Sequence, residues 1–248
     1  MQSEAQNLPA ILPLGTDALV VRFSLIPALS ANAAAQVFTA DLAAIMPAGI
    51  HEIVPSLASV MVRFDPEEIT RARLTKHLSG VLAKRDWSNI SAPAPTRRWI
   101  IPAAFGGTFG PQLDTAAQAA GISPAQALGE LQSARLSVLA IGFAPGQPFL
   151  GLLPEHWNFP RLSELTPQVP AGALVAAVRQ LVLFANPSAT GWRHIGQTTF
   201  RPFRPESAQP FPLKTGDEVV FEAVDHTAFA DLVERGDEAA DTARLELL

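Results

Sequence analysis

The sequence has neither cysteine nor tyrosine among its 248 residues. The chain therefore forms no disulfide, thiolate nucleophile or cysteine metal site, and no phenol serves as acid or base. No apolar run is long enough to span a bilayer, and the first residues lack the pattern of a signal peptide, which predicts a cytoplasmic protein without a membrane partner. A formal charge of −5 without a basic stripe argues against nucleic acid as a partner.

Residues 1–92 are predicted to form a small α+β domain with helices packed on one side of an antiparallel sheet. Apolar periodicity indicates strands at 16–24, 51–55 and 58–65 and helices at 30–46 and 68–82. The second helix has a typical start, with Asp65 as cap, Pro66 in the first turn and Glu68 reaching back as in a capping box.

The segment SAPAPT (91–96) is the best linker candidate, because its prolines keep the chain extended. Residues 97–248 are predicted to form a second domain, with two short helices and then several strands between Gly/Pro-rich loops. The second short helix has Ser123 as cap and Pro124 in its first turn. Such strands favour an antiparallel barrel or sandwich. The tail after Arg235 is predicted either to add an edge strand or to remain mobile.

Two β-rich segments contain candidate site residues. GFAPGQPFLG (142–151) is either a rigid crossover of the barrel or a backbone cradle in which Gln147 supplies a directed amide. In 173–185, read as one strand, Arg179 and Gln180 face opposite sides, and we favour Gln180 for the interior.

The segment 189–203 contains His194, whose near-neutral pKa suits proton transfer, although a structural role is the commoner one. If side chains alternate regularly along this strand, with no bulge near Gly196, those of Trp192 and His194 lie on the same face. The five histidines are too scattered to indicate a metal site. GGTFGPQLD (106–114) is either an ordinary turn or an anion site before a helix.

Four segments follow one another in the order of a known family: GFAPGQPFLGLLPE, FPRLSELTPQVPAGA, TGWRHIGQTTFRPFRP and PFPLKTGDEVVF. With PLGTDALVVRF and SVMVRFDP nearer the start, they resemble the allophanate hydrolase subunit 1 family, whose members are also known as KipI proteins or as the B-type subunits of 5-oxoprolinase. The resemblance covers almost the whole chain.

The resemblance implies a cyclophilin-like β-barrel after the N-terminal α+β domain. It also implies a hydrolase component that is inactive without two partners, a C-type homologue similar to allophanate hydrolase subunit 2 and an A-type homologue. The expected reaction uses ATP to open 5-oxo-L-proline to glutamate. ATP is expected to bind either on this chain or on a partner subunit.

Two alternatives remain open: a KipI-like regulatory protein that inhibits a histidine kinase, and an allophanate or urea-related hydrolase or carboxyltransferase subunit. A prolyl isomerase has little support, because fold alone does not determine function.

The sequence departs from the family pattern at Leu131, Gln147, Ala173 and Gln197, where an imidazole, an aromatic, a hydroxyl and a guanidinium are usual. Either the contacts have moved to Gln147, Gln197 and His194, or the substrate has changed. Within this resemblance His194 is the candidate general acid or base, and no metal site is expected. The candidate substrate-binding residues are Gly142, Pro145, Gly146, Gln147, Arg161, Gly172, Gln180, Trp192, Gly196 and Thr198.

Overall fold

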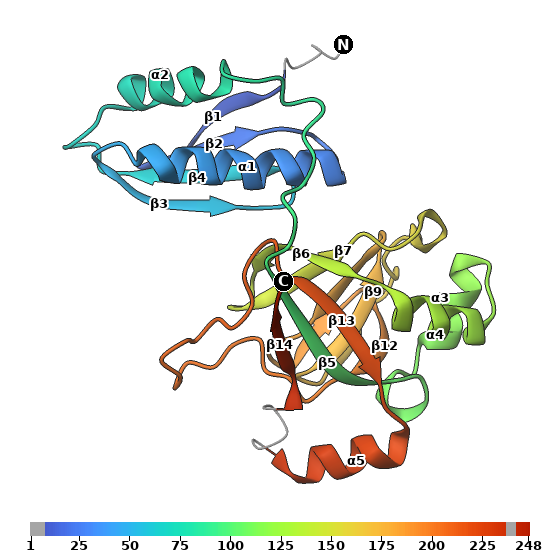
Figure 1. Cartoon of the computed structure of the whole chain (residues 1–248). Coiled ribbons are helices and arrows are strands. Elements are labelled where there is room, and N and C mark those ends of the chain that lie inside the picture. Colours follow the sequence, from blue (N-terminus) through green and yellow to red (C-terminus); the bar gives the residue numbers. More distant parts are fainter. Residues whose placement is uncertain (1–7, 237–241) are drawn as a thin grey trace. The chain divides into compact units, whose positions relative to one another are not determined.

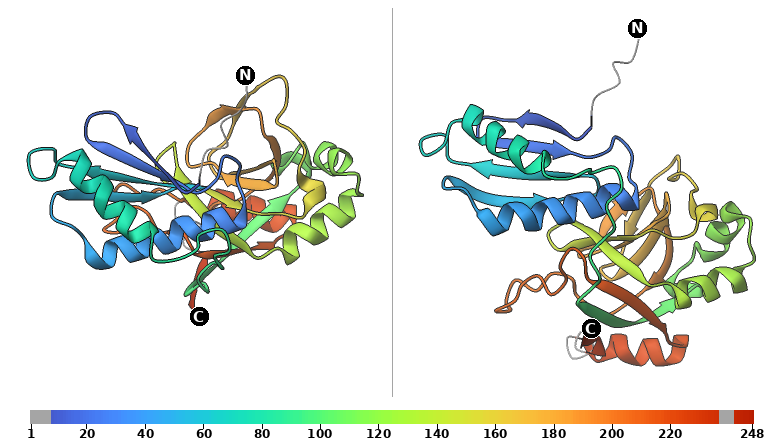
Figure 2. Two further views of the ribbon diagram at one scale, coloured as in Figure 1. Left: turned by 90° about the horizontal axis from the view of Figure 1, so that it is seen from above. Right: turned by 45° about the horizontal axis from the view of Figure 1, so that its top comes forward.

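The computed structural model describes residues 8–236 and 242–248. The chain divides into two compact units, residues 1–94 and 95–248, which Figures 1 and 2 show in three views. In the described part of the chain, no helix combines the length and the apolar character needed to cross a membrane.

The first unit is a four-stranded antiparallel sheet in the order β1-β2-β4-β3. Both helices cover the same face of this sheet (Figure 2). The core between the layers includes Phe23, Phe38 and Trp87, whose ring centroids lie 5.4–5.7 Å apart. The elements are β1 (Ala10–Leu14), β2 (Ala18–Arg22), α1 (Leu29–Ile45), β3 (Ile50–Pro55), β4 (Ser59–Phe64) and α2 (Arg71–Leu82).

The start of α2 differs from the prediction. Thr70, rather than Asp65, is the N-cap, and its side chain accepts a hydrogen bond from the amide of Arg73 at 3.3 Å. Asp65 instead closes a turn ahead of the helix, because its carboxylate accepts the amide of Glu67 at 2.8 Å. The capping-box assignment was wrong because Asx turns and helix caps share the same local sequence signal.

Strand β1 was also missed.

The second unit is a closed barrel, which confirms the predicted α+β fold with a cyclophilin-like barrel. Its strands follow the order β12-β9-β10-β7-β6-β13-β5, and β12 pairs again with β5. All these pairs are antiparallel except β5–β13, which is parallel. The barrel elements are β5 (Arg97–Phe105), β6 (Leu136–Gly142), β7 (Gln147–Gly151), β9 (Ala173–Ala177), β10 (Gln180–Leu183), β12 (Arg193–Gln197) and β13 (Glu218–Ala223).

Helices and short strands surround the barrel. Ser123 caps α4 with Pro124 at its first position, as predicted. The C-terminal tail adds an edge strand, β14, to β5, which is one of the two outcomes predicted for it, while residues 237–241 of the tail lie outside the described residues. Helix α5 was missed. The remaining elements are η1 (Gly107–Phe109), α3 (Leu113–Ala120), α4 (Pro124–Ser133), η2 (Glu155–Trp157), β8 (Thr166–Val169), β11 (Ser188–Thr190), α5 (His226–Glu234) and β14 (Arg244–Leu247).

The segment 173–185, which was read as one strand, is a hairpin. Val178 and Arg179 form its two-residue turn, both with positive φ (45° and 65°), between β9 and β10. Two positive φ values suit the twist of a hairpin, but Asn-Gly is the usual sequence there, so nothing in Val-Arg signalled the turn. Arg179 therefore does not lie on a sheet face: its Nε donates to the carbonyl of Leu153 at 2.9 Å, and its guanidinium pairs with Glu155.

The turn predicts a stabilising substitution. Val178 is β-branched and disfavours positive φ, whereas asparagine tolerates it. We expect Val178→Asn to raise the free energy of unfolding by about 1 kcal/mol, measured by urea denaturation. Arg179→Ala is the matched comparison and should lower stability, because the Leu153 carbonyl loses its partner. Destabilisation by Val178→Asn would contradict this account of the turn.

Candidate functional site

Two loops of the barrel meet at Gly172 and Thr198. The amide of Thr198 donates to the carbonyl of Gly172 at 2.9 Å, and the amide of Gly172 donates to the carbonyl of Phe184 at 2.8 Å. Gly172 has φ +80°, and a Cβ there would lie 2.0 Å from the carbonyl oxygen of Thr198. Only glycine therefore permits this approach of the two backbones.

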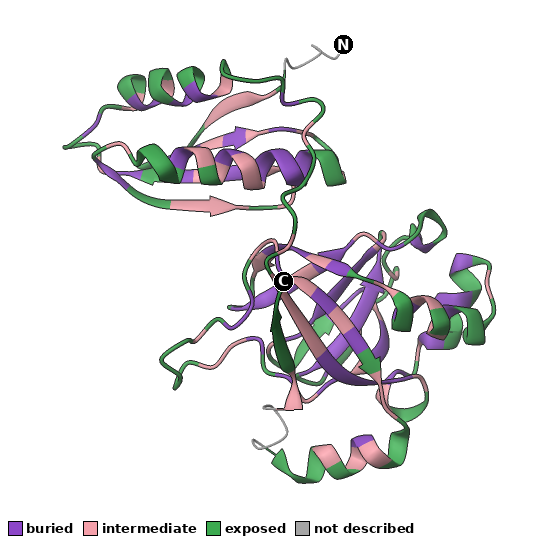
Figure 3. Ribbon diagram, viewed as in Figure 1, coloured by how far each residue is buried: buried purple, intermediate pink, exposed green. Residues whose placement is uncertain are grey.

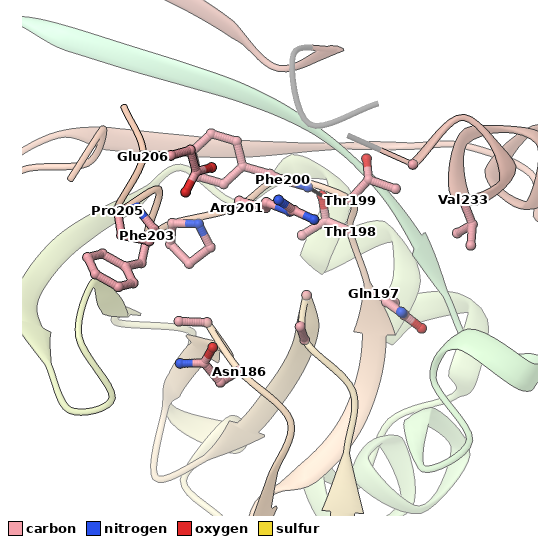
Figure 4. A pocket seen from close by; sticks show the side chains of 15 residues that line it. Asn186, Gln197, Thr198, Thr199, Phe200, Arg201, Phe203, Pro205, Glu206 and Val233 are labelled. Carbon is pink, nitrogen blue, oxygen red and sulfur yellow. Dashed lines mark hydrogen bonds between the residues drawn. The ribbon is translucent and has the colours of Figure 1, made fainter. Parts of the chain in front are cut away.

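A cavity of about 500 Å³ opens beside this contact (Figure 4). The turn before β9 supplies one wall, the end of β10 a second, the segment after β12 a third, and the end of α5 the rim. The lining residues are Ala171, Gly172, Ala185, Asn186, Gln197, Thr198, Thr199, Phe200, Arg201, Pro202, Phe203, Pro205, Glu206, Val233 and Gly236.

The polar groups of the cavity converge from different loops. Arg201 and Asn186 lie on opposite sides of the open space (Figure 4), and Glu206 also lines the cavity. The hydroxyl of Thr198 accepts the amide of Phe200 at 3.1 Å, which fixes the turn that leads to Arg201. A guanidinium facing an amide in a small cavity suits a ligand with a carboxylate and a neutral polar group.

A second group of predicted residues shares one face of the barrel sheet. His194 lies opposite Val175, Val175 opposite Val182, and Val182 opposite Phe149. Residues directly opposite one another project to the same side, as do residues two apart in a strand. Gln180, two residues before Val182, and Gln147, two before Phe149, therefore share the face of His194, and both are buried.

Trp192 and Arg161 extend this polar face. The Trp192 ring contacts that of Phe149 edge-on, with centroids 6.3 Å apart. The Arg161 guanidinium lies over the indole of Trp192, 5.2 Å from its centroid, a cation–π contact.

His194 is buried, and its Nε2 has no hydrogen-bond partner. Burial lowers the pKa of His194 below its ordinary value of 6.5, while a hydrogen bond to the Gly196 backbone partly opposes this effect. The imidazole is therefore neutral at neutral pH. The Gln112 side chain accepts the His194 amide at 2.7 Å, so the start of α3 holds the backbone of β12.

The structure separates most of the predicted site residues into three groups. Gly172 and Thr198 line the cavity, while Gln147, Gln180, Trp192 and His194 share the polar face. Gly142 ends β6, Pro145 and Gly146 belong to the tight β6–β7 turn, and a Cβ on Gly146 would lie 2.7 Å from the carbonyl oxygen of Pro202. Gly196 packs against Phe105 of β5.

Sequence reasoning missed Asn186, Arg201 and Glu206 in the cavity. Each lies in a loop whose partners are far away in sequence, so no local pattern identifies it. The only available signal was the FRPFRP run (200–205), whose prolines fix the loop that carries Arg201. Within residues 8–236 and 242–248, no three His, Asp or Glu side chains gather as metal ligands.

The barrel, the α+β unit and the motif-lined cavity define the class to which the chain belongs. The family model described as "Carboxyltransferase domain, subdomain C and D" matches residues 9–213, so the chain is a member of this family.

Among curated relatives, the B subunit of 5-oxoprolinase from Bacillus subtilis is 33% identical over 181 residues, covering 70% of this chain and 75% of the relative. The solved structure of TTHA0988 is 27% identical with a TM-score of 0.69, over 84% of this chain but 40% of TTHA0988. This chain thus spans less than half the length of TTHA0988. Urea amidolyase of K. lactis shares the fold at 18% identity and a TM-score of 0.75, over 95% of this chain and 16% of the amidolyase.

The buried imidazole predicts a pH dependence of stability. The native His194 has the lower pKa, so the unfolded chain takes up this proton first as the pH falls. The free energy of unfolding should therefore fall below about pH 6.5, by at most about 1.4 kcal/mol per pH unit, until the native pKa is reached.

We expect His194→Gln to reduce this acid sensitivity in urea denaturation curves recorded between about pH 5 and pH 8. His77→Gln, which changes an exposed histidine on α2, is the control and should leave the pH dependence as in the parent chain. Equal slopes for the parent and His194→Gln would exclude a buried neutral imidazole.

Proposed function

We propose that the chain is the B-type subunit of an ATP-dependent 5-oxoprolinase that opens 5-oxo-L-proline to glutamate, acting with A-type and C-type homologues. The observation that carries this proposal is the meeting of two family motifs, VPAGA (169–173) and IGQTTFRP (195–202), at one cavity that also holds Arg201 and Asn186. The identity to the B subunit of 5-oxoprolinase from Bacillus subtilis supports it.

The substrate's chemistry suits this cavity. 5-Oxo-L-proline is a five-membered lactam with one carboxylate, and a guanidinium with a facing amide can hold the carboxylate and orient the ring. ATP would phosphorylate the lactam oxygen and release ADP. Water would then add to the activated carbon, and the ring C–N bond would break as the nitrogen takes up a proton, which leaves an acyl phosphate. A second water would hydrolyse this acyl phosphate to glutamate and phosphate. ATP would bind on a partner or at a site shared with it.

Two departures from the family pattern lie away from the cavity. Leu131 in α4 and Ala173 at the start of β9 are both fully buried among core residues. Their apolar side chains stabilise the barrel, so these changes do not by themselves replace a ligand contact in this chain. Gln197 belongs to the lining of the cavity, but its side chain points away from the open space (Figure 4). None of these three departures therefore removes a side chain from the cavity, which favours retention of the enzymatic role.

The proposal predicts activity only in the assembled complex. We expect glutamate and ADP release from 5-oxo-L-proline and ATP when the chain is combined with its native A-type and C-type partners, and none when it is omitted. No turnover by a stable assembled complex would exclude 5-oxo-L-proline as substrate. If the chain instead bound and inhibited a histidine kinase without turnover, the regulatory alternative would hold.

Within an active complex, Arg201→Ala should lower kcat/KM by about 10- to 100-fold, because the carboxylate loses a charge-assisted contact of about 1.5–3 kcal/mol. Asn186→Ala should have a smaller effect of the same kind. Arg73→Ala, which removes an exposed arginine from α2, is the control and should leave kcat/KM unchanged. Unaltered kcat/KM in Arg201→Ala would show that this cavity does not hold the carboxylate.

A further inference from the structure

Strand β14 is attached to the barrel along one edge. It pairs antiparallel with β5, with Arg244 opposite Ile100 and Glu246 opposite Arg98. The amide of Leu248 donates to the carbonyl of Thr96 at 3.0 Å, so Leu248 belongs to a hydrogen-bonded pair. Because such pairs alternate along an antiparallel ladder, Glu246 and Arg244 also direct their backbone groups toward β5.

Leu245 and Leu247 consequently direct their N–H and C=O groups away from the barrel. No strand of the described residues pairs with this outer edge. The side chains of the same two residues are 45% and 82% exposed, and the whole strand is drawn as exposed in Figure 3. An ordered edge strand with unpaired amides and exposed leucines is a template for pairing with another strand.

We propose that β14 pairs antiparallel with β14 of a second copy of this chain, about a two-fold axis through Glu246. In this register Leu245 lies opposite Leu247 of the second copy, and each of these pairs exchanges two hydrogen bonds. All the outward-facing backbone groups of the two leucines are thereby satisfied. The four leucines gather on one face, which removes apolar surface from water on both copies.

The strand sequence suits this self-pairing. The same two residues, separated by Glu246, supply both the backbone groups that no described strand pairs with and the exposed apolar side chains, so one copy complements the other without a new surface. Glu246 faces Glu246 of the second copy, but each carboxylate is already bridged to its own Arg98 at 3.3 Å. These ion pairs reduce the repulsion across the axis.

The absence of cysteine makes the register directly testable. Glu246 would lie across the axis in a pair without hydrogen bonds, where Cα atoms are about 4.5 Å apart, within the disulfide range. We expect Glu246→Cys to form a disulfide-linked dimer rapidly under mild oxidation. Arg244→Cys is the matched control on the same strand and should not cross-link, because its two copies would be about 13 Å apart.

A second measurement tests association without a cross-link. Sedimentation of the full chain at concentrations up to about 1 mM should show a reversible dimer, since a contact of one strand pair is small and weak. Leu247→Pro removes a donor that faces outward and leaves the β5 ladder intact, so it should shift the chain to the 26.4 kDa monomer. Leu165→Lys, which changes another exposed leucine, should not.

Rapid cross-linking of Glu246→Cys alone, together with loss of the dimer in Leu247→Pro, supports the proposal. A monomer at every concentration would overturn it. Equal cross-linking of Glu246→Cys and Arg244→Cys would overturn it as well, because this result indicates random collision. The proposal would also be overturned if the outer edge of β14 were paired only in the complex with the A-type and C-type homologues. The strand that pairs with β14 would then belong to a different protein.

Discussion

The second unit depends on one short strand that closes the barrel. β12 pairs with β9 on one side and reaches β5 on the other through Gly196 and Gln197. A Cβ on Gly196 would lie 2.8 Å from the carbonyl oxygen of Ala104 and 2.7 Å from the Phe105 ring, so a side chain there would push β5 away. The register shifts between His194 and Gly196, and the bulge allows the strand to satisfy both neighbouring strands.

This closure also positions the candidate site. The segment that leaves β12 passes directly over Gly172, where the hydrogen bond from Thr198 joins it to the turn before β9. The same segment then carries Arg201 to the cavity and brings Pro202 against Gly146 of the β6–β7 turn. Three Gly/Pro-rich motifs that are far apart in sequence therefore meet because glycine permits close backbone contacts at each crossing.

The fold could be predicted where the sequence pattern is local. Apolar periodicity predicted α1, and Ser123 before Pro124 predicted the start of α4. Local patterns failed where tertiary contacts decide the conformation. Val178 and Arg179 turn the chain because Leu153 and Glu155 hold the arginine. The alternation of side chains that starts at Trp192 does not continue past His194, because β12 must bulge to close the barrel.

The candidate site could be predicted only in part, for a related reason. Gly172 and Thr198 were predicted because they lie in segments that resemble motifs of a known family. Asn186 and Arg201 are ordinary polar residues in loops, and what makes them a site is the distance between loops that only the closed barrel determines. Because the segment after β12 carries Arg201 and Glu206 to this cavity, substrate selectivity in this chain should depend on that segment more strongly than on the buried positions Leu131 and Ala173.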